Sequence, residues 1–160
     1  MKLKEWLEQN QDKEIVFEDG KLIITEPEPN SRWKPEQGDL FFYIIAGGEV
    51  YKGRWTRNLN DEMIYAMGNV FKTAKEAEDA AECLKIRAEL LDCGGHGFVK
   101  GEDNVTISYD PGWDCLIETT CKLARPIAFA IYFDNDQAAR DAIETVGEDR
   151  IKKYLFGIEG

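Results

Sequence analysis

Apolar residues alternate with polar ones in several short segments of the chain and recur at helical spacing in others. The first alternation predicts a hairpin of strands at 14–18 and 21–25, because the Asp19-Gly20 pair between two apolar runs favours a two-residue turn. Ahead of it, the apolar spacing within residues 3–7 predicts a short amphipathic helix. The stretch 26–31 contains two prolines and is predicted to be a linker.

A second hairpin is predicted after the linker, from a strand at 40–45, a turn at 47–48 and a strand at 49–51. The first of these strands is apolar on both of its alternating faces, which indicates a central strand covered on two sides. A third strand is predicted at about 65–71.

A helix is predicted from Thr73 to about Leu91, where Cys93-Gly94-Gly95 ends it. Thr73 caps its start and Glu76 completes a capping box. One side carries mainly small residues suited to close packing on a sheet: Ala77, Ala80, Ala81, Leu84, Ala88 and Leu91. A second apolar stripe lies nearly opposite and consists of Cys83, Ile86 and Leu90. This stripe is either covered by the final helix or the linker, or forms an apolar interface with a partner or in a homodimer.

The rest of the chain repeats this plan. Strands are predicted at 105–109, 113–118 and 127–133, followed by a helix that Asn135 caps and a final short helix over 148–156. The apolar side of the final helix consists of Ile151, Tyr154 and Leu155.

These patterns predict an α+β fold with antiparallel sheets and helices packed on one face. Residues 1–30 form an N-terminal helix and hairpin, while 31–95 and 96–160 form two strand–helix halves of one compact body. Aligning the helix caps Thr73 and Asn135 matches several alanines of the two helices, so an internal duplication of a three-strand-plus-helix unit is a further interpretation.

The charge of the chain narrows the choice of partners. The 160 residues include 31 acidic and 20 basic ones, a net charge of −11. A field of this sign repels phosphate backbones, so direct nucleic-acid binding is not expected, whereas a basic protein surface would be attracted. The alternative is that the charge only maintains solubility. No apolar run is long enough to cross a bilayer and the start lacks a signal-peptide stretch, so we expect a cytoplasmic protein without a membrane partner.

Candidate chemistry is sparse, and no enzyme, metal site or cofactor is expected. Cys93 and His96 have chelating spacing, but a tetrahedral zinc site needs two further ligands. The same two residues would be the source of any cysteine-based activity, yet nothing basic around them predicts a lowered thiol pKa. Free thiols are expected. The glycines do not form a phosphate-binding loop between a strand and a helix.

Two sets of residues resemble a module of short, uncharacterised phage and prophage proteins of Gram-positive bacteria. The first set consists of Trp33-Lys34-Pro35, Gly38, Tyr43, Gly48, Val50, Trp55, Gly68-Asn69-Val70-Phe71, Thr73 and Glu76-Ala77-Glu78. The second consists of Ile131-Tyr132-Phe133, Ala138-Ala139 and the ending from Gly147 to Gly157. The resemblance implies a phage accessory protein, a class that includes many inhibitors of host defence, and it assigns no site residues.

The leading hypothesis is therefore an anti-defence inhibitor, such as an anti-CRISPR protein, that occupies the basic channel of a host nuclease complex. Carboxylates would replace phosphates in pairing with arginine. The candidate contacts are Glu76, Asp79, Glu82 and Asp149. Two alternatives stay open: a phage interaction protein that dimerises or scaffolds through the Cys83, Ile86 and Leu90 stripe, and a protein that binds a small molecule in a pocket.

Overall fold

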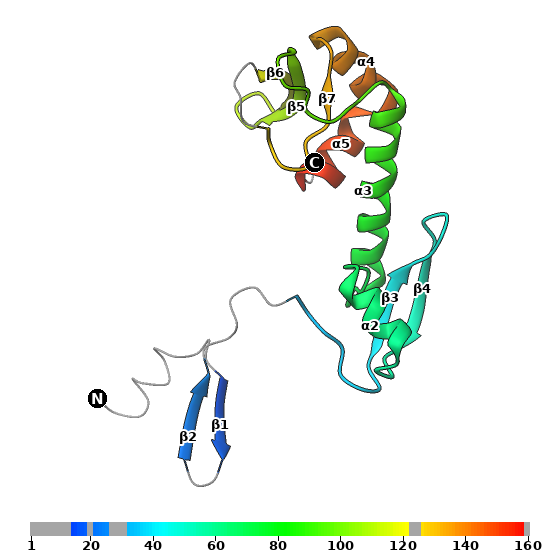
Figure 1. Ribbon diagram of the computed structural model, residues 1–160, viewed down its shortest axis with the longest axis vertical. Coiled ribbons are helices and arrows are strands. Elements are labelled where there is room, and N and C mark those ends of the chain that lie inside the picture. The colour runs from blue at the N-terminus through cyan, green and yellow to red at the C-terminus, as the bar shows by residue number, and fades with distance from the viewer. Residues whose placement is uncertain (1–13, 19–20, 26–31, 122–125, 159–160) are drawn as a thin grey trace, which may run out of the picture. The chain divides into compact units, whose positions relative to one another are not determined.

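The computed structural model describes residues 14–18, 21–25, 32–121 and 126–158, and the chain divides into two units, 1–34 and 35–160 (Figure 1). In the first unit, β1 (Glu14–Glu18) and β2 (Lys21–Thr25) form an antiparallel hairpin, as predicted. The helix predicted at 3–7, the turn Asp19-Gly20 and the linker at 26–31 lie outside the described residues.

In the second unit, β3 (Leu40–Ile44) and β4 (Val50–Arg54) form the second predicted hairpin. The prediction that the strand at 40–45 is central and covered on both sides is wrong. β3 has β4 on one side and, within the described residues, only an isolated bridge from Phe42 to Phe71 on the other. Its first residue, Leu40, is 45% exposed.

The apolar residues of this hairpin serve a small aromatic core instead. Trp55 is fully buried at its centre. Its ring meets Phe41 edge-on at 5.5 Å between centroids and Tyr65 edge-on at 6.2 Å. Edge-to-face packing of this kind places the positive rim of one ring on the negative face of the next. We call Phe41, Trp55 and Tyr65 the aromatic core.

The strand predicted at 65–71 is also wrong, because most of this region belongs to a helix and its connection to the next one. Helix α2 (Leu59–Ala66) begins at Asn58, whose side chain accepts a hydrogen bond from the Asp61 backbone N–H at 2.9 Å. The Asp61 carboxylate accepts bonds from both the N–H and the hydroxyl of Thr56. These local caps outweigh the apolar pattern, and only Phe71 keeps a strand-like pairing.

Helix α3 (Ala74–Asp92) confirms the predicted boundaries. Thr73 and Glu76 form the capping box, and the helix ends where the Gly94 N–H bonds to the Leu91 carbonyl. Gly94 has a φ of 93°, a left-handed conformation that favours glycine. Figure 1 shows α3 running from the β3–β4 hairpin to the helices near the C-terminus.

The buried face of α3 differs from the predicted one. Ile86 and Leu90 are buried, whereas Leu84 and Leu91 are 61% and 49% exposed. Of the two alternatives for the Cys83, Ile86 and Leu90 stripe, burial supports cover within the protein and corrects the partner interface: Ile86 and Leu90 lie in one buried cluster with Ile151 of the final helix. The physical reason is that α3 has different neighbours along its length, so its buried side shifts around the axis after Ala77 and Ala81.

A three-stranded antiparallel sheet forms the second half, in the order β6-β5-β7. β5 (Asn104–Asp110) pairs along its whole length with β6 (Cys115–Cys121). The two strands were predicted, but β6 begins two residues later than the predicted 113–118 and extends three residues further. The third strand is much shorter than the predicted 127–133. β7 consists only of Tyr132–Phe133, and it pairs with two residues at the start of β5.

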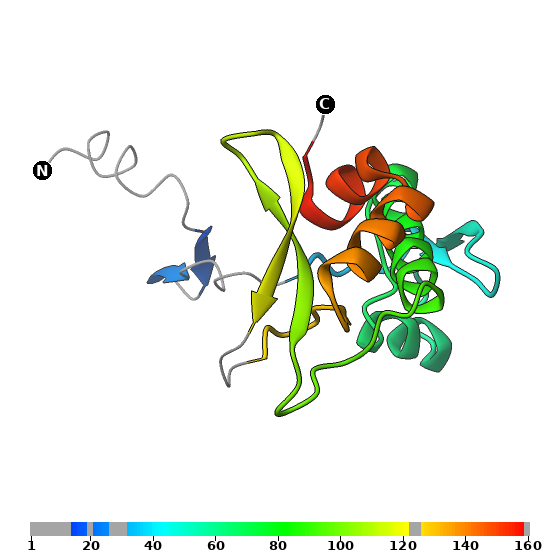
Figure 2. The ribbon, with the colours of Figure 1, turned by 90° about the horizontal axis from the view of Figure 1, so that it is seen from above.

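Helices α4 (Asp136–Val146) and α5 (Glu148–Phe156) follow as predicted, the first capped by the Asn135 side chain. Figure 2 shows α3, α4 and α5 on the same side of the sheet. The buried residues between these layers form one apolar cluster, which we call the sheet core: Ile86, Leu90, Val105, Ile131, Phe133, Ala139, Ala142, Val146 and Ile151. Tyr154 and Leu155 pack against it, which confirms the predicted apolar side of α5.

The α+β class with antiparallel sheets is thus confirmed, whereas the internal duplication is not. In the first half, helix α2 follows the hairpin, whereas the described residues between β6 and β7 in the second half include no helix. In the part of the chain that the structure describes, no helix combines the length and the apolarity that crossing a bilayer requires.

The packing of α3 gives a direct test. Changing Ile86 to Ala should lower the free energy of unfolding by about 2–5 kcal/mol, because it removes buried methyl groups and leaves a cavity. Changing Leu84, on the exposed side of the same helix, to Ala should alter it by no more than about 0.5 kcal/mol. Urea unfolding of both variants measures the difference. A larger loss of stability for Leu84→Ala than for Ile86→Ala would mean that α3 buries the side that carries its alanines and Leu84.

Candidate functional site

The carboxylates predicted on α3 are engaged within the protein. The Glu76 side chain accepts bonds from the N–H groups of Lys72 and Thr73, where it completes the helix cap. Asp79 pairs with Lys75 one turn earlier. Both groups remain near the surface, but their charges are partly satisfied by local partners, so the helix itself accounts for them.

Glu82 has a structural partner far along the chain. The guanidinium of Arg150, on α5, bonds to Glu82 through Nε at 3.0 Å and to Glu89 through Nη1 at 2.8 Å. Arg150 lowers the pKa of the Glu89 carboxyl below its ordinary value, chiefly through the hydrogen bond between them, and the two glutamates raise the pKa of Arg150. This pairing joins α5 to α3, so the charge of Glu82 is already compensated.

Asp79 and Glu82 nevertheless share one surface feature. They line a polar hollow of about 440 Å³ between α3 and the loop of the β3–β4 hairpin. Lys75 and Lys85 line the same hollow and supply opposite charge. The hollow therefore contains both acidic and basic side chains, and it attracts a basic partner less than its carboxylates alone would.

Asp149, the fourth predicted residue, is exposed in the first turn of α5. Among the described residues it makes no ion pair, and neither Asp149 nor Glu76 lines the hollow that Asp79 and Glu82 share. Negative charge in the first turn also complements the helix dipole.

Sequence reasoning missed a set of exposed carboxylates on α4. The buried side of this helix carries small and branched apolar residues, so the opposite side faces solvent and carries Asp136, Asp141 and Glu144. We call these three residues the acidic face of α4. Arg140 lies among them, but Glu118 of β6 holds its guanidinium at 2.9 Å. The helical period of 136–146 was a sufficient signal for this face.

Among the described residues, no hydrogen bond joins Cys93 to His96. The His96 ring has Nδ1 at 2.7 Å from the Gly97 carbonyl and Nε2 at 3.3 Å from a carboxylate oxygen of Asp134. The His96 backbone pairs with Tyr132 in both directions, while Cys93 packs against the sheet core. Within the described part of the chain, no cluster of His, Cys, Asp or Glu is suited to a metal ion.

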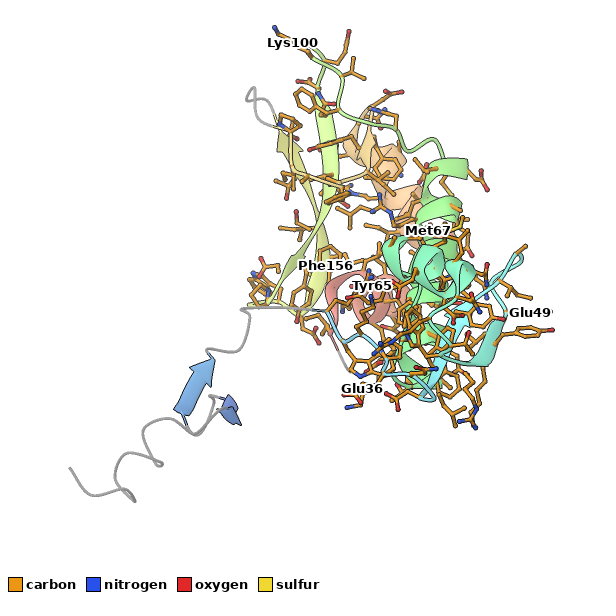
Figure 3. All side chains as sticks on the ribbon, turned by 60° about the horizontal axis from the view of Figure 1, so that its bottom comes forward. Glu36, Glu49, Tyr65, Met67, Lys100 and Phe156 are labelled. Atoms are coloured by element: carbon orange, nitrogen blue, oxygen red, sulfur yellow. The ribbon has the colours of Figure 1, made fainter. Side chains whose placement is uncertain are left out.

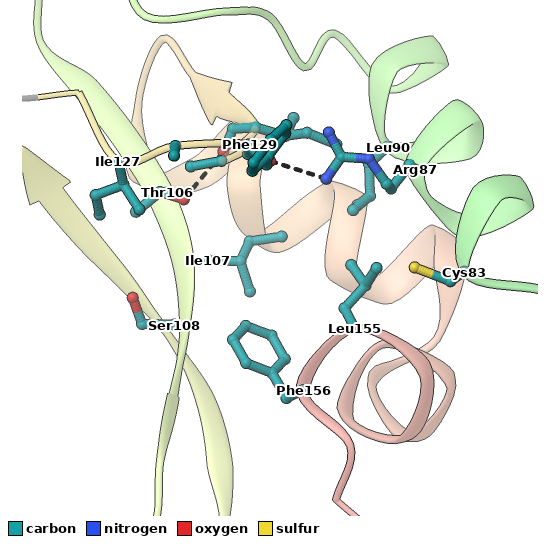
Figure 4. Close-up of a pocket in the computed structure, with 13 residues that line it drawn as sticks. Cys83, Arg87, Leu90, Thr106, Ile107, Ser108, Ile127, Phe129, Leu155 and Phe156 are labelled. Carbon is teal, nitrogen blue, oxygen red and sulfur yellow. Dashed lines mark hydrogen bonds between the residues drawn. The ribbon is translucent and has the colours of Figure 1, made fainter. Parts of the chain in front are cut away.

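An apolar cavity of about 420 Å³ lies between the sheet and helices α3 and α5 (Figure 4). Ile107 of β5 faces Leu155 and Phe156 of α5 across it. Figure 3 shows Phe156 beside the sheet, where its ring lies 6.4 Å from that of Tyr109. The cavity exists because β7 is short. The sequence predicted a full strand at 127–133 and therefore did not indicate a cavity.

A further polar contact ties the start of α5 to the sheet. The Glu148 carboxylate accepts a hydrogen bond from the Leu116 N–H of β6 at 3.1 Å and lies 3.1 Å from Lys152 Nζ. These two bonds, the Leu116 N–H first, lower the pKa of Glu148 below its ordinary value of 4.5. The charged carboxylate is therefore the form that stabilises the fold.

Acidification should expose this contribution. Because the folded pKa of Glu148 is lowered, its stabilisation is present above pH about 4.5 and is lost as the pH falls through the folded value. Changing Glu148 to Gln should lower the urea midpoint at pH 7 and make its decline between about pH 5 and 3 shallower. The matched change of Glu144 to Gln, on the acidic face of α4, should alter neither the urea midpoint at pH 7 nor its decline in acid. Equal acid profiles for all three proteins would contradict the Glu148 assignment.

Comparisons with known proteins add nothing to this geometry: no protein-family model, no curated protein and no solved structure matches the chain. The interpretation of the site therefore depends on the residues and contacts described above.

Proposed function

We propose that this protein is a non-catalytic binding protein that presents the acidic face of α4 to a basic surface of a macromolecular partner. The observation that carries the proposal is a contrast between the carboxylates of α3 and those of α4. Those of Glu82 and Glu89 are held by Arg150 and stabilise the fold. Those on the outer side of α4 face solvent, while the one cation among them is held by Glu118.

The charge balance of the second unit supports this reading. Residues 35–160 include 23 acidic and 14 basic side chains, a net charge of −9. A folded body with this charge accelerates encounters with a basic partner and excludes acidic ones. Carboxylates presented on a rigid helix pair with arginine in the manner of phosphate oxygens, because arginine bonds planar anions with two parallel donors.

A basic surface of this kind is a property of proteins that hold nucleic acids. Together with the resemblance to phage and prophage proteins, it makes a host defence nuclease complex the proposed target and the cytoplasm of an infected or lysogenic host the proposed location. The protein would act as an anti-CRISPR-like inhibitor that competes with nucleic acid for the basic channel. Direct nucleic-acid binding by the protein itself is not part of the proposal.

Charge reversal on α4 tests the proposal. A variant with Asp141→Lys and Glu144→Lys should recover its nuclease complex from a defence-competent host lysate at least about tenfold less well than the unmodified protein. The matched control is Glu102→Lys with Asp103→Lys, which changes the net charge equally at an exposed loop and should leave recovery nearly intact. High salt should weaken recovery of the unmodified protein.

Circular dichroism of both variants separates a binding effect from misfolding. If the α4 variant and the loop variant retain recovery equally, the acidic face is not the contact. If both lose it equally, total charge rather than this face determines binding.

A second candidate function, self-association, is favoured by α2. This helix and its C-cap residue Met67 expose three apolar side chains spaced by four residues: Leu59, Met63 and Met67 are 78%, 56% and 80% accessible. Such spacing places them on one side of a helix. A second copy of the chain would cover this side in an antiparallel helix pair.

Sedimentation equilibrium tests this candidate. A dimer that Met63→Glu converts to a monomer, and that Leu84→Glu on α3 leaves intact, would support it. A monomer at all concentrations would dispose of it.

A further inference from the structure

The apolar cavity occupies the space beside β5 into which β7 does not extend. β7 pairs with β5 only at Val105 and Thr106, so in the part of the chain that the structure describes no strand accompanies β5 beyond that point on this side. The chain leaves the sheet before β7 through residues 127–131, which form the rim of the cavity (Figure 4). A volume of about 420 Å³ is within the range of sites for small ligands, about 300–1,000 Å³.

The lining is apolar apart from a few groups. Apolar side chains come from all three surrounding elements: Leu90 of α3, Ile107 of β5, and Leu155 and Phe156 of α5. The hydroxyls of Thr106 and Ser108 lie along β5, and Thr106 already donates to the Ile131 carbonyl at 3.0 Å. A ligand in this space would therefore be mostly hydrocarbon.

Among the described residues that line the cavity, Arg87 is the one that carries a charge. Its Nη1 donates to the Phe129 carbonyl at 2.8 Å, and Figure 4 shows the guanidinium at the rim. Among the described residues it has no carboxylate within ion-pair distance, although the chain is rich in acidic side chains. The other donors of the guanidinium are available for an anion, and the apolar surroundings strengthen such a pair.

The backbone beside Arg87 adds a second unusual feature. Phe129 has a φ of 64°, a left-handed conformation that is strained for a residue with a side chain, and it is 88% exposed. The conformation directs its carbonyl to Arg87. Strain of this kind is concentrated at binding sites, and the exposed ring stands at the rim where it could cover a ligand.

We propose that this cavity binds a small amphipathic carboxylate, in the class of medium-chain fatty acids. The carboxylate would pair with Arg87 at the rim, and the hydrocarbon chain would lie among Ile107, Leu155 and Phe156. This site is separate from the acidic face of α4, so the proposal does not depend on the proposed partner. It assigns the protein a small-molecule ligand in addition to a macromolecular one.

Calorimetric titration of the full chain with decanoate, and with 1-decanol as the uncharged control, tests the proposal. Decanoate should bind one to one and at least about tenfold more tightly than 1-decanol, because a charge-assisted pair with Arg87 adds to burial of the chain. Changing Arg87 to Gln, which keeps a donor for the Phe129 carbonyl, should remove this preference while 1-decanol binds as before. Changing Ile107 to Trp should fill the cavity and abolish binding of both.

A measurement on the unmodified protein guards against a variant that fails to fold. In an amide NMR titration with decanoate, the shifts should be largest at Thr106, Ile107 and Ser108 of β5. The proposal would be overturned by no binding of decanoate or by equal affinity for decanoate and 1-decanol. Shifts confined to residues away from the cavity would also overturn it, because they would indicate an apolar contact elsewhere. Decanoate affinity unchanged by Arg87→Gln would equally overturn it.

Discussion

Ala77 and Ala81 of α3 are buried in the half of the helix that lies beside the β3–β4 hairpin, while Ile86 and Leu90, further along, enter the sheet core. One helix of 19 residues therefore contributes to two groups of buried residues. The small side chains of Ala77 and Ala81 let the hairpin approach α3 closely, and the larger side chains of Ile86 and Leu90 fill the space between α3 and the sheet. Because α3 also pairs with α5 through Arg150, its position determines where both the polar hollow and the apolar cavity form.

What the sequence predicted well was local. The capping box at Thr73 and the cap at Asn135 placed two helix starts correctly, since a cap is formed by residues within one turn. The hairpins followed from alternation and turn residues. Helix α2 was missed although Asn58 supplies an equally local cap: no element was predicted for residues 58–64, and the strand predicted at 65–71 overlaps only the end of the helix.

What the sequence could not predict depends on distant contacts. The buried side of α3 changes along the helix with its neighbours, so a single helical stripe could not describe it. β7 is short because the chain turns away at Phe129, whose left-handed conformation no glycine announces. For the candidate site, Glu82 looked like a free carboxylate, but Arg150, 68 residues later, compensates it. The apolar cavity depends on the shortness of β7, so the sequence could not predict it either.

Hydrogen exchange of the α3 amides tests most directly whether one helix holds both groups of buried residues. If one helix holds both groups, the amides around Ala81 and Leu90 should exchange together, at rates set by unfolding of the second unit as a whole. Exchange around Ala81 that is much faster, in step with the β3–β4 hairpin while Leu90 stays protected, would contradict it. In that case the two cores would open independently, and α3 would not determine the geometry of both surfaces.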